Sequence, residues 1–125
     1  MNHYIKQIDP KMCILLETEI WPNLIHALNK NNIPSFLVNA RLSKRSLKRY
    51  QKFAPNLARQ TLNKLNIIAA QNQNSADRLI ELGADTDRVI VSGNIKFDQN
   101  LNTDKVISKK LQAIIGKRKV LVFAS

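Results

Sequence analysis

Residues 12–23, which read MCILLETEIWPN, decide the fold of this chain. Residues 12–16 are all apolar, which is typical of a short strand buried on both faces of a parallel sheet. Two carboxylates, Glu17 and Glu19, follow this run, and Pro22 suits the first turn of a helix. The stretch therefore predicts a buried strand and then a helix, with a carboxylate at the point where the strand ends.

The same alternation of short apolar runs and helical segments continues along the chain. Further strands are predicted at 35–38, 67–70, 89–91 and 120–123, and helices at 44–53, 55–65, from 74 or 75 to 83, and near 103–115. Ser43 and either Asn74 or Ser75 are the predicted helix caps. This order indicates an α/β domain with a parallel sheet. Because the sequence stops on an apolar strand, we expect a fragment of a longer chain.

The composition is that of a globular protein with a strong positive charge. The 125 residues are 44% hydrophobic and 23% charged, and the formal net charge is +11. No apolar run approaches ~20 residues, and residues 1–10 lack the apolar centre of a secretory signal. The single cysteine, Cys13, is predicted to be a buried hydrophobic residue in a cytoplasmic protein. The charge leaves three acidic partners open: nucleic acid, an anionic membrane and a phosphorylated substrate.

Polar side chains follow every predicted strand. They are Glu17, Thr18 and Glu19, then Asn39 and Arg41, then Gln71 and Asn72, then Ser92, Asn94 and Lys96, and last Ser125. Carboxyl ends of parallel strands share one edge, so these groups are expected to converge on one rim. Because turn residues are commonly polar, many of these side chains need no functional explanation. Glu17 and Lys96 stand out because a charge beside buried apolar residues needs a partner or a task. Glu19 is expected to complement a helix dipole.

The span 44–64 is strongly basic and contains no acidic residue. Its basic residues are Lys44, Arg45, Lys48, Arg49, Lys52, Arg59 and Lys64. Leu47, Tyr50 and Phe53 can form a separate apolar face. This pattern favours a basic amphipathic helix for a membrane surface or for phosphate groups, and a merely solvated basic helix is the equal alternative.

The sequence predicts neither a metal site nor a bound cofactor. His3 and His26 are far apart and have no ligand spacing. With only three glycines, the chain has neither a phosphate-binding loop nor a dinucleotide fingerprint.

Four blocks of the sequence resemble one known family. They are DPKMCILLETEIWPNLI at 9–25, IPSFLVNARLSKRS at 33–46, IIAAQNQNSADRLIELGA at 67–84 and VSGNIKFD at 91–98. In this order they are similar to the lipid A-specific 3-deoxy-D-manno-octulosonic acid (Kdo) transferases of lipopolysaccharide synthesis. The end of the chain, VLVFAS at 120–125, looks like the first strand of that family's second domain.

The resemblance implies a GT-B glycosyltransferase, in which a cleft separates two Rossmann-like domains. The chain would then be a partial N-terminal domain with a Rossmann-like parallel sheet. Residues 1–101 would form the latter part of the acceptor-binding domain, and 102–118 a linker or helix. Residues 119–125 would be the truncated first strand of the domain that binds CMP-Kdo.

The resemblance also implies an activity and a location. Family members transfer Kdo from CMP-Kdo to a lipid A precursor, lipid IVA, by direct displacement and without a cofactor. Glu17 and Lys96 match residues that stabilise the transition state, and we assign Asn39, Arg41 and Asn94 to substrate binding. The family's general base precedes the matched blocks and is absent here, so we expect the chain alone to be inactive. We expect peripheral attachment to the cytoplasmic face of the bacterial inner membrane, and we expect no specific binding of nucleic acid.

Two other hypotheses stay open. In the first, the chain is a non-catalytic basic module that binds anionic lipid or nucleic acid. The sequence shows no evident platform of aromatic residues for base stacking, so nucleic-acid binding would be salt-sensitive and independent of sequence. In the second, the chain needs a complementary chain to fold, because a sheet without its first strands exposes an edge and an apolar face.

Overall fold

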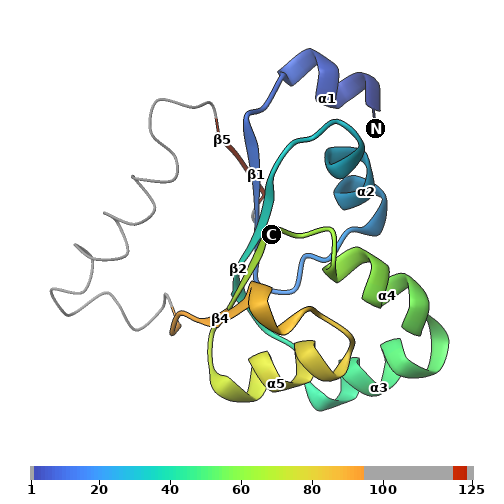
Figure 1. The fold of residues 1–125 in the computed structure, drawn as a ribbon, viewed down its shortest axis with the longest axis vertical. Helices are drawn as coiled ribbons and strands as arrows, with labels where there is room; N and C mark the ends of the chain where they lie inside the picture. Colours follow the sequence, from blue (N-terminus) through green and yellow to red (C-terminus); the bar gives the residue numbers. More distant parts are fainter. Residues whose placement is uncertain (1, 95–119, 124–125) are drawn as a thin grey trace, which may run out of the picture.

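A parallel β-sheet forms the centre of the structure, a computed structural model that describes residues 2–94 and 120–123 (Figure 1). The sheet has five strands in the order β4-β3-β2-β1-β5, and every neighbouring pair is parallel. The strands are β1 (Met12–Leu16), β2 (Ser35–Ala40), β3 (Ile67–Ala70), β4 (Val89–Val91) and β5 (Val120–Phe123). The predicted α/β class with a parallel sheet is confirmed.

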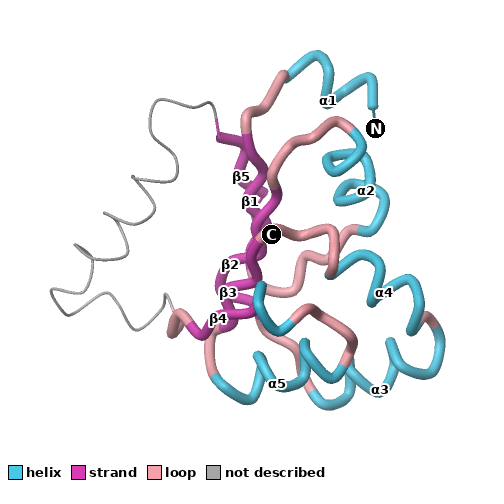
Figure 2. The backbone as a smooth tube through the Cα atoms, viewed as in Figure 1, coloured by secondary structure: helices cyan, strands magenta, loops and turns pink. Residues whose placement is uncertain are grey.

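The described α-helices cover one face of this sheet (Figure 2). They are α1 (Asn2–Ile8), α2 (Pro22–Lys30), α3 (Lys44–Phe53), α4 (Pro55–Leu62) and α5 (Gln73–Glu81), and a short 3-10 helix, η1 (Thr86–Arg88), precedes β4. Strands β1 to β4 lie side by side in chain order. Right-handed crossovers that all step in one direction place their helices on one side.

Local sequence signals explain where these helices begin. Pro22 and Pro55 occupy the first turns of α2 and α4, where the missing N–H costs nothing. The Ser43 hydroxyl caps α3 by accepting a hydrogen bond from the Ser46 N–H at 3.0 Å. The cap of α5 is Asn72, whose Oδ1 accepts from the Ser75 N–H at 2.8 Å. The prediction of a cap at 74 or 75 was wrong, because the amide of Asn72 reaches the first turn and starts the helix earlier.

The core lies between the sheet and this helical layer. Alternate strand residues face the helices and are buried, among them Cys13, Leu15, Leu37, Ile68 and Ala70. From the helices, the buried residues packed against them include Leu24, Ile25, Leu28, Leu62 and Leu79. Burial raises the pKa of the Cys13 thiol to about 11, as expected for a small apolar core residue.

Strand β5 extends the same sheet at the free edge of β1. The register pairs Met12 with Val120 and Leu15 with Phe123. The expected boundaries at 1–101, 102–118 and 119–125 stay a prediction, because the described residues stop at 94 and resume only at 120. Within the described ranges no helix is long and apolar enough to cross a membrane.

Candidate functional site

The carboxyl ends of β1 and β2 are joined by two backbone hydrogen bonds that centre on Glu17. The Glu17 N–H donates to the Val38 carbonyl at 3.0 Å, and the Glu17 carbonyl accepts from the Arg41 N–H at 3.3 Å. Asn39 lies between these two anchor points, Val38 on β2 and Arg41 just after it. Glu17, Asn39 and Arg41, three of the predicted site residues, therefore meet at one position on the edge of the sheet.

The next strands continue this rim in the same way. The Gln71 N–H, just after β3, donates to the Ala40 carbonyl at 3.0 Å. The Ser92 N–H, just after β4, donates to the Ala70 carbonyl at 2.9 Å. Each strand end is thus held to its neighbour, so the rim is a continuous edge of the sheet.

Glu17 and Asn39 both have left-handed backbone conformations. Their φ angles are 58° and 54°, in a region that residues other than glycine rarely adopt. Such a conformation costs roughly 1–2 kcal/mol for most residues, and less for asparagine. At Asn39 it coincides with a shift in the register between β2 and β3, which lies between Val38 and Ala40. Strained backbone of this kind gathers at functional sites, and here it marks two adjacent strand ends.

Asn39 also has a buried oxygen without a hydrogen bond. The residue is only 5% exposed, and no donor among the described residues reaches its Oδ1. An unpaired buried acceptor costs about 1–3 kcal/mol. The amide oxygen of Asn39 is therefore an unsatisfied acceptor within the described residues, beside the ends of β1 and β2.

The two acids of the opening stretch have different surroundings. Glu17 is half-buried at the strand end and takes part in a further non-covalent interaction besides its two backbone hydrogen bonds. Glu19 precedes α2, and its Oε2 accepts from the Trp21 indole N–H. Glu19 was expected to serve the helix dipole, but α2 begins at Pro22 after an N-cap at Trp21, so its first turn holds no acid. That expectation was wrong, because the indole N–H offers the carboxylate a nearer partner.

The remaining predicted residues lie around β4. Asn94 follows this strand, is partly buried and takes part in a non-covalent interaction. Lys96 lies outside the described residues. Two strands separate β4 from β1, so their ends are about 14 Å apart at ~4.8 Å per strand. The rim thus offers two polar ends, one at Glu17 and one at Asn94. The predicted convergence of Lys96 on the same rim as Glu17 stays a prediction.

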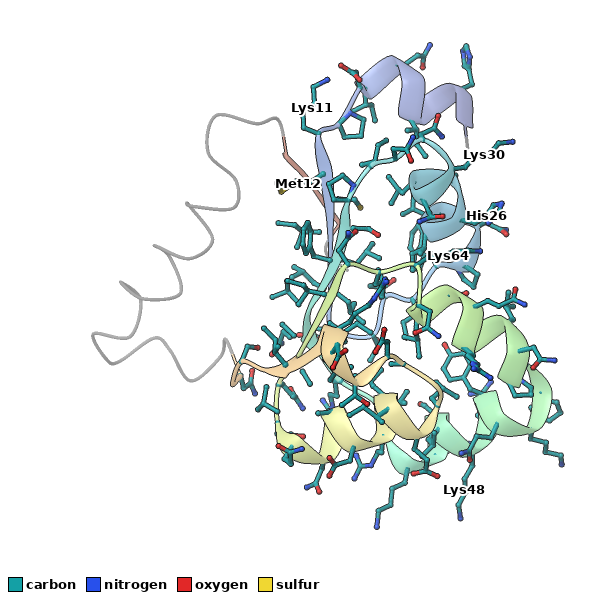
Figure 3. The ribbon with its side chains drawn as sticks, in the orientation of Figure 1. Lys11, Met12, His26, Lys30, Lys48 and Lys64 are labelled. Atoms are coloured by element: carbon teal, nitrogen blue, oxygen red, sulfur yellow. The ribbon has the colours of Figure 1, made fainter. Side chains whose placement is uncertain are left out.

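Histidines, cysteine and acids form no metal-binding cluster of three within the described residues. His26 lies beside Lys64, with 2.9 Å between its Nδ1 and the Lys64 Nζ (Figure 3). This pair lies in the helical layer, with His26 on α2 and Lys64 just after α4.

The sequence profile of one family, described as 3-deoxy-D-manno-octulosonic-acid transferase (kdotransferase), matches residues 1–99. The chain belongs to this family. Its members are glycosyltransferases, which agrees with the resemblance seen in the sequence blocks around Glu17 and Asn39.

Similar proteins from two bacteria extend this finding. A 3-deoxy-D-manno-octulosonic acid transferase of Haemophilus influenzae is 42% identical over 115 residues, which are 91% of this chain and 26% of that protein. A bifunctional glycosyltransferase/methyltransferase of Fusobacterium nucleatum is 37% identical over 128 residues, covering 100% of this chain and 20% of that protein. The chain spans about a quarter of the length of these curated relatives.

The fold has a counterpart among solved structures. The UDP-GlcNAc 2-epimerase of Neisseria meningitidis, solved with UDP-GlcNAc, matches 91% of this chain and 32% of its own chain. The TM-score is 0.53 at 22% sequence identity. This likeness shows the Rossmann-like α/β arrangement and says nothing of the reaction.

Proposed function

We propose that this chain is part of the acceptor-binding domain of an enzyme that transfers Kdo from CMP-Kdo to a lipid A precursor, lipid IVA. Membership of the Kdo transferase family supports the reaction class. The observation that carries the site is the half-buried Glu17, which has a left-handed conformation and is held by backbone hydrogen bonds to Val38 and Arg41. The enzyme needs the remainder of both domains, so the chain alone is expected to be inactive.

In the proposed reaction, the acceptor hydroxyl attacks the anomeric carbon of Kdo while its bond to the CMP phosphate breaks. The hydroxyl proton goes to a general base outside this chain, and CMP leaves with the electron pair. Positive charge grows on the sugar ring and negative charge on the departing phosphate. The Glu17 carboxylate would stabilise the first and the Lys96 ammonium the second.

Three further residues would hold the substrates. The Asn39 Oδ1 would accept a hydrogen bond from a sugar hydroxyl, which supplies the partner it lacks within the described chain. Arg41 is exposed directly after β2, where its guanidinium can bind a phosphate or carboxylate with two parallel hydrogen bonds. Asn94 would contact the substrate from the other end of the rim.

The proposed setting is the cytoplasmic face of the bacterial inner membrane. The acceptor is a lipid, and the net charge of +11 suits an anionic surface. The described chain would attach there peripherally. A complementary chain or the rest of a longer chain would supply the missing parts.

A transfer assay on the full-length protein that carries this segment tests the proposal. With CMP-Kdo and lipid IVA, Glu17→Gln should lower kcat by about 100-fold, the usual cost of removing one charge-stabilising group. Glu19→Gln is the matched control and should leave kcat unchanged, because Glu19 contacts the Trp21 indole instead. An unchanged kcat in Glu17→Gln would overturn the site assignment, and turnover by the 125-residue chain alone would overturn its predicted inactivity.

A second candidate function is a non-catalytic basic module that binds anionic lipid or nucleic acid. The acid-free helix α3 is the observation that favours it. Activity of the full-length protein that depends on Glu17 would exclude a purely non-catalytic role.

A further inference from the structure

Arg78, in the last turn of α5, reaches across to the segment that joins β2 to α3. Its Nη1 donates a hydrogen bond to the Leu42 carbonyl at 2.9 Å, although the two residues are 36 positions apart in the sequence. Arg78 is partly buried, and it forms no salt bridge within the described ranges. Among the described residues, its guanidinium therefore serves the backbone of the segment that follows β2.

The segment 41–43 is held from two sides. On one side, the Arg41 N–H donates to the Glu17 carbonyl at 3.3 Å, which ties the segment to the end of β1. On the other side, the Leu42 carbonyl accepts from Arg78, which ties the segment to α5. The two bonds lie on adjacent residues. A continuous path of hydrogen bonds and backbone therefore runs from Arg78 to Glu17, whose own backbone is left-handed.

Helix α5 is itself fixed at both ends. The Gln71 N–H, just before the helix, donates to the Ala40 carbonyl at 3.0 Å, and the Asn72 side chain caps the first turn. Helices α5 and α3 lie side by side (Figure 1), and the Gln51 Nε2 of α3 donates to the Glu81 Oε1 of α5 at 3.1 Å. A side chain on this helix is therefore held by a rigid element, as the precise support of a binding group requires.

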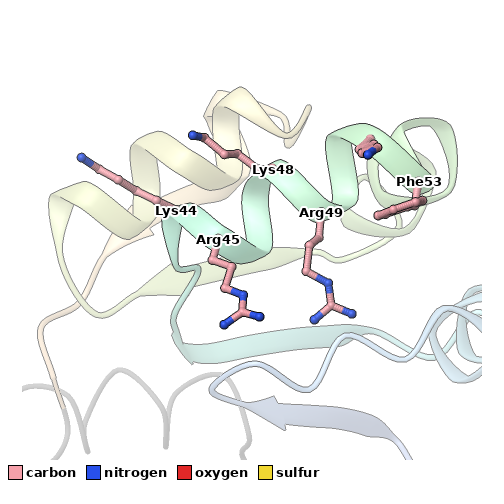
Figure 4. Close-up of a pocket in the computed structure, with 6 residues that line it drawn as sticks. Lys44, Arg45, Lys48, Arg49 and Phe53 are labelled. Carbon is pink, nitrogen blue, oxygen red and sulfur yellow. The ribbon is translucent and has the colours of Figure 1, made fainter.

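The segment 41–43 also leads directly into α3. The cations of this helix line an open groove of about 400 Å³ (Figure 4), and they include Lys44, Arg45, Lys48 and Arg49. A peptide unit is planar, so a fixed Leu42 carbonyl also fixes the N–H of the next residue. The orientation of this one peptide therefore affects the Arg41 side chain before it and the start of the groove after it.

We propose that Arg78 is a positioning residue for the substrate-binding rim. By holding the Leu42 peptide, it sets the place of the Arg41 guanidinium and supports the strand end that carries Glu17. It acts through these residues and does not itself contact substrate. A displacement of about 1 Å in a binding group can lower the rate about 100-fold, so such a support is functionally important. The inference rests on the proposed function for the substrate role of Arg41.

Arg88 provides a matched control, because it makes the same kind of contact at the other edge of the sheet. Its Nη1 donates to the Asn63 and Leu65 carbonyls at 2.9 and 3.0 Å, and it is also partly buried. These carbonyls precede β3, so they lie at the amino ends of the parallel strands. Arg78→Met and Arg88→Met each remove a guanidinium and keep an apolar stem. If Arg78 only stabilised the fold, the two variants would behave alike.

Hydrogen exchange of the full-length protein that carries this segment tests the support without any substrate. In Arg78→Met the Arg41 amide should exchange about tenfold faster, because the segment loses a hydrogen bond from a charged donor. The Gln71 amide, which bonds to Ala40 on the same rim, should keep its rate. In Arg88→Met the two amides should change in the same proportion. Equal acceleration of both amides in Arg78→Met, or no acceleration, would overturn the inference.

Transfer kinetics of the same variants, with CMP-Kdo and lipid IVA, test the consequence for the reaction. Arg78→Met should raise by about tenfold the KM of the substrate whose KM rises in Arg41→Gln, with a smaller change in kcat. The reason is that a misplaced Arg41 weakens ground-state and transition-state binding alike. Arg78→Lys keeps a charged donor and should recover part of the loss.

A double variant shows whether one arginine acts through the other. Combined with Arg41→Gln, Arg78→Met should raise KM no further. Additive effects, or an equal rise of KM in Arg88→Met, would overturn the inference. If Arg41→Gln alone leaves both KM values unchanged, the proposed substrate role of Arg41 fails. The exchange rates still decide in that case whether Arg78 holds the segment.

Discussion

Replacing Asn39 by glycine is expected to stabilise the chain and, in the full-length protein, to weaken substrate binding. The φ angle of 54° suits glycine better than any other residue, and the buried Oδ1 without a donor disappears with the side chain. Both changes favour the folded state. The proposed contact to a substrate hydroxyl is lost at the same time.

The size of the effect follows from opposing contributions. Relief of the left-handed backbone gains up to about 1 kcal/mol, and removal of the unpaired acceptor gains about 1–3 kcal/mol. Against this, glycine adds about 0.5–1 kcal/mol of entropy to the unfolded chain, and the lost side-chain packing costs about 1 kcal/mol. The net result is a free energy of unfolding higher by about 1 kcal/mol.

Urea unfolding followed by circular dichroism measures this change. Asn32→Gly is the matched control, because Asn32 has a similar φ of 56° but is exposed. It should change the free energy of unfolding by less than ~0.5 kcal/mol, since backbone relief and glycine entropy nearly cancel. A loss of more than ~1 kcal/mol in Asn39→Gly would show that Oδ1 is satisfied in solution, which contradicts the argument. A cooperative transition would also contradict the need for a complementary chain.

Two further predictions concern stability. Gly83→Ala should destabilise by roughly 1–2 kcal/mol, because φ is +106° and the new Cβ would lie 2.9 Å from the Arg59 Cγ. Gly93 has a φ of +85°, but no heavy atom lies within 4 Å of the position that an added Cβ would take. The difference between Gly83→Ala and Gly93→Ala in urea unfolding therefore measures the Arg59 contact. Burial raises the pKa of the Cys13 thiol from 9.0 to about 11. Between these two pH values the thiol stays protonated in the folded state and ionises in the unfolded state. Stability should fall as pH rises from 9 to 11, and this fall should vanish in Cys13→Ala.

The strands were predictable because each is an apolar run between polar turns. The sequence placed β1, β3, β4 and β5 within their observed bounds, while β2 continues two residues beyond the predicted 35–38. Those residues are Asn39 and Ala40, where a polar residue interrupts the run. Pairing with neighbouring strands, which no local pattern encodes, keeps them in the sheet. Helix α1 was missed because it has no clear apolar period.

The candidate site was predictable in position and not in detail. Glu17 could be singled out because a carboxylate directly follows a buried run. The left-handed backbone at Glu17 and Asn39 could not be foreseen, since it depends on hydrogen bonds between β1 and β2 and on the register with β3. The unpaired Oδ1 of Asn39 depends on the same long-range packing. Sequence spacing carries no signal for either feature.

The two anchor points that join Glu17 to β2 have a consequence for protein engineering. The Glu17 backbone is held by the Val38 carbonyl and the Arg41 N–H, so its conformation is encoded more than twenty residues away. Grafting the ETE tripeptide onto another parallel sheet would transfer the carboxylate without its geometry. The transferable unit is the pair of strand ends, with the irregularity at Asn39 included. A designer who regularises β2 to gain stability would therefore reposition the carboxylate without changing any residue in its own loop.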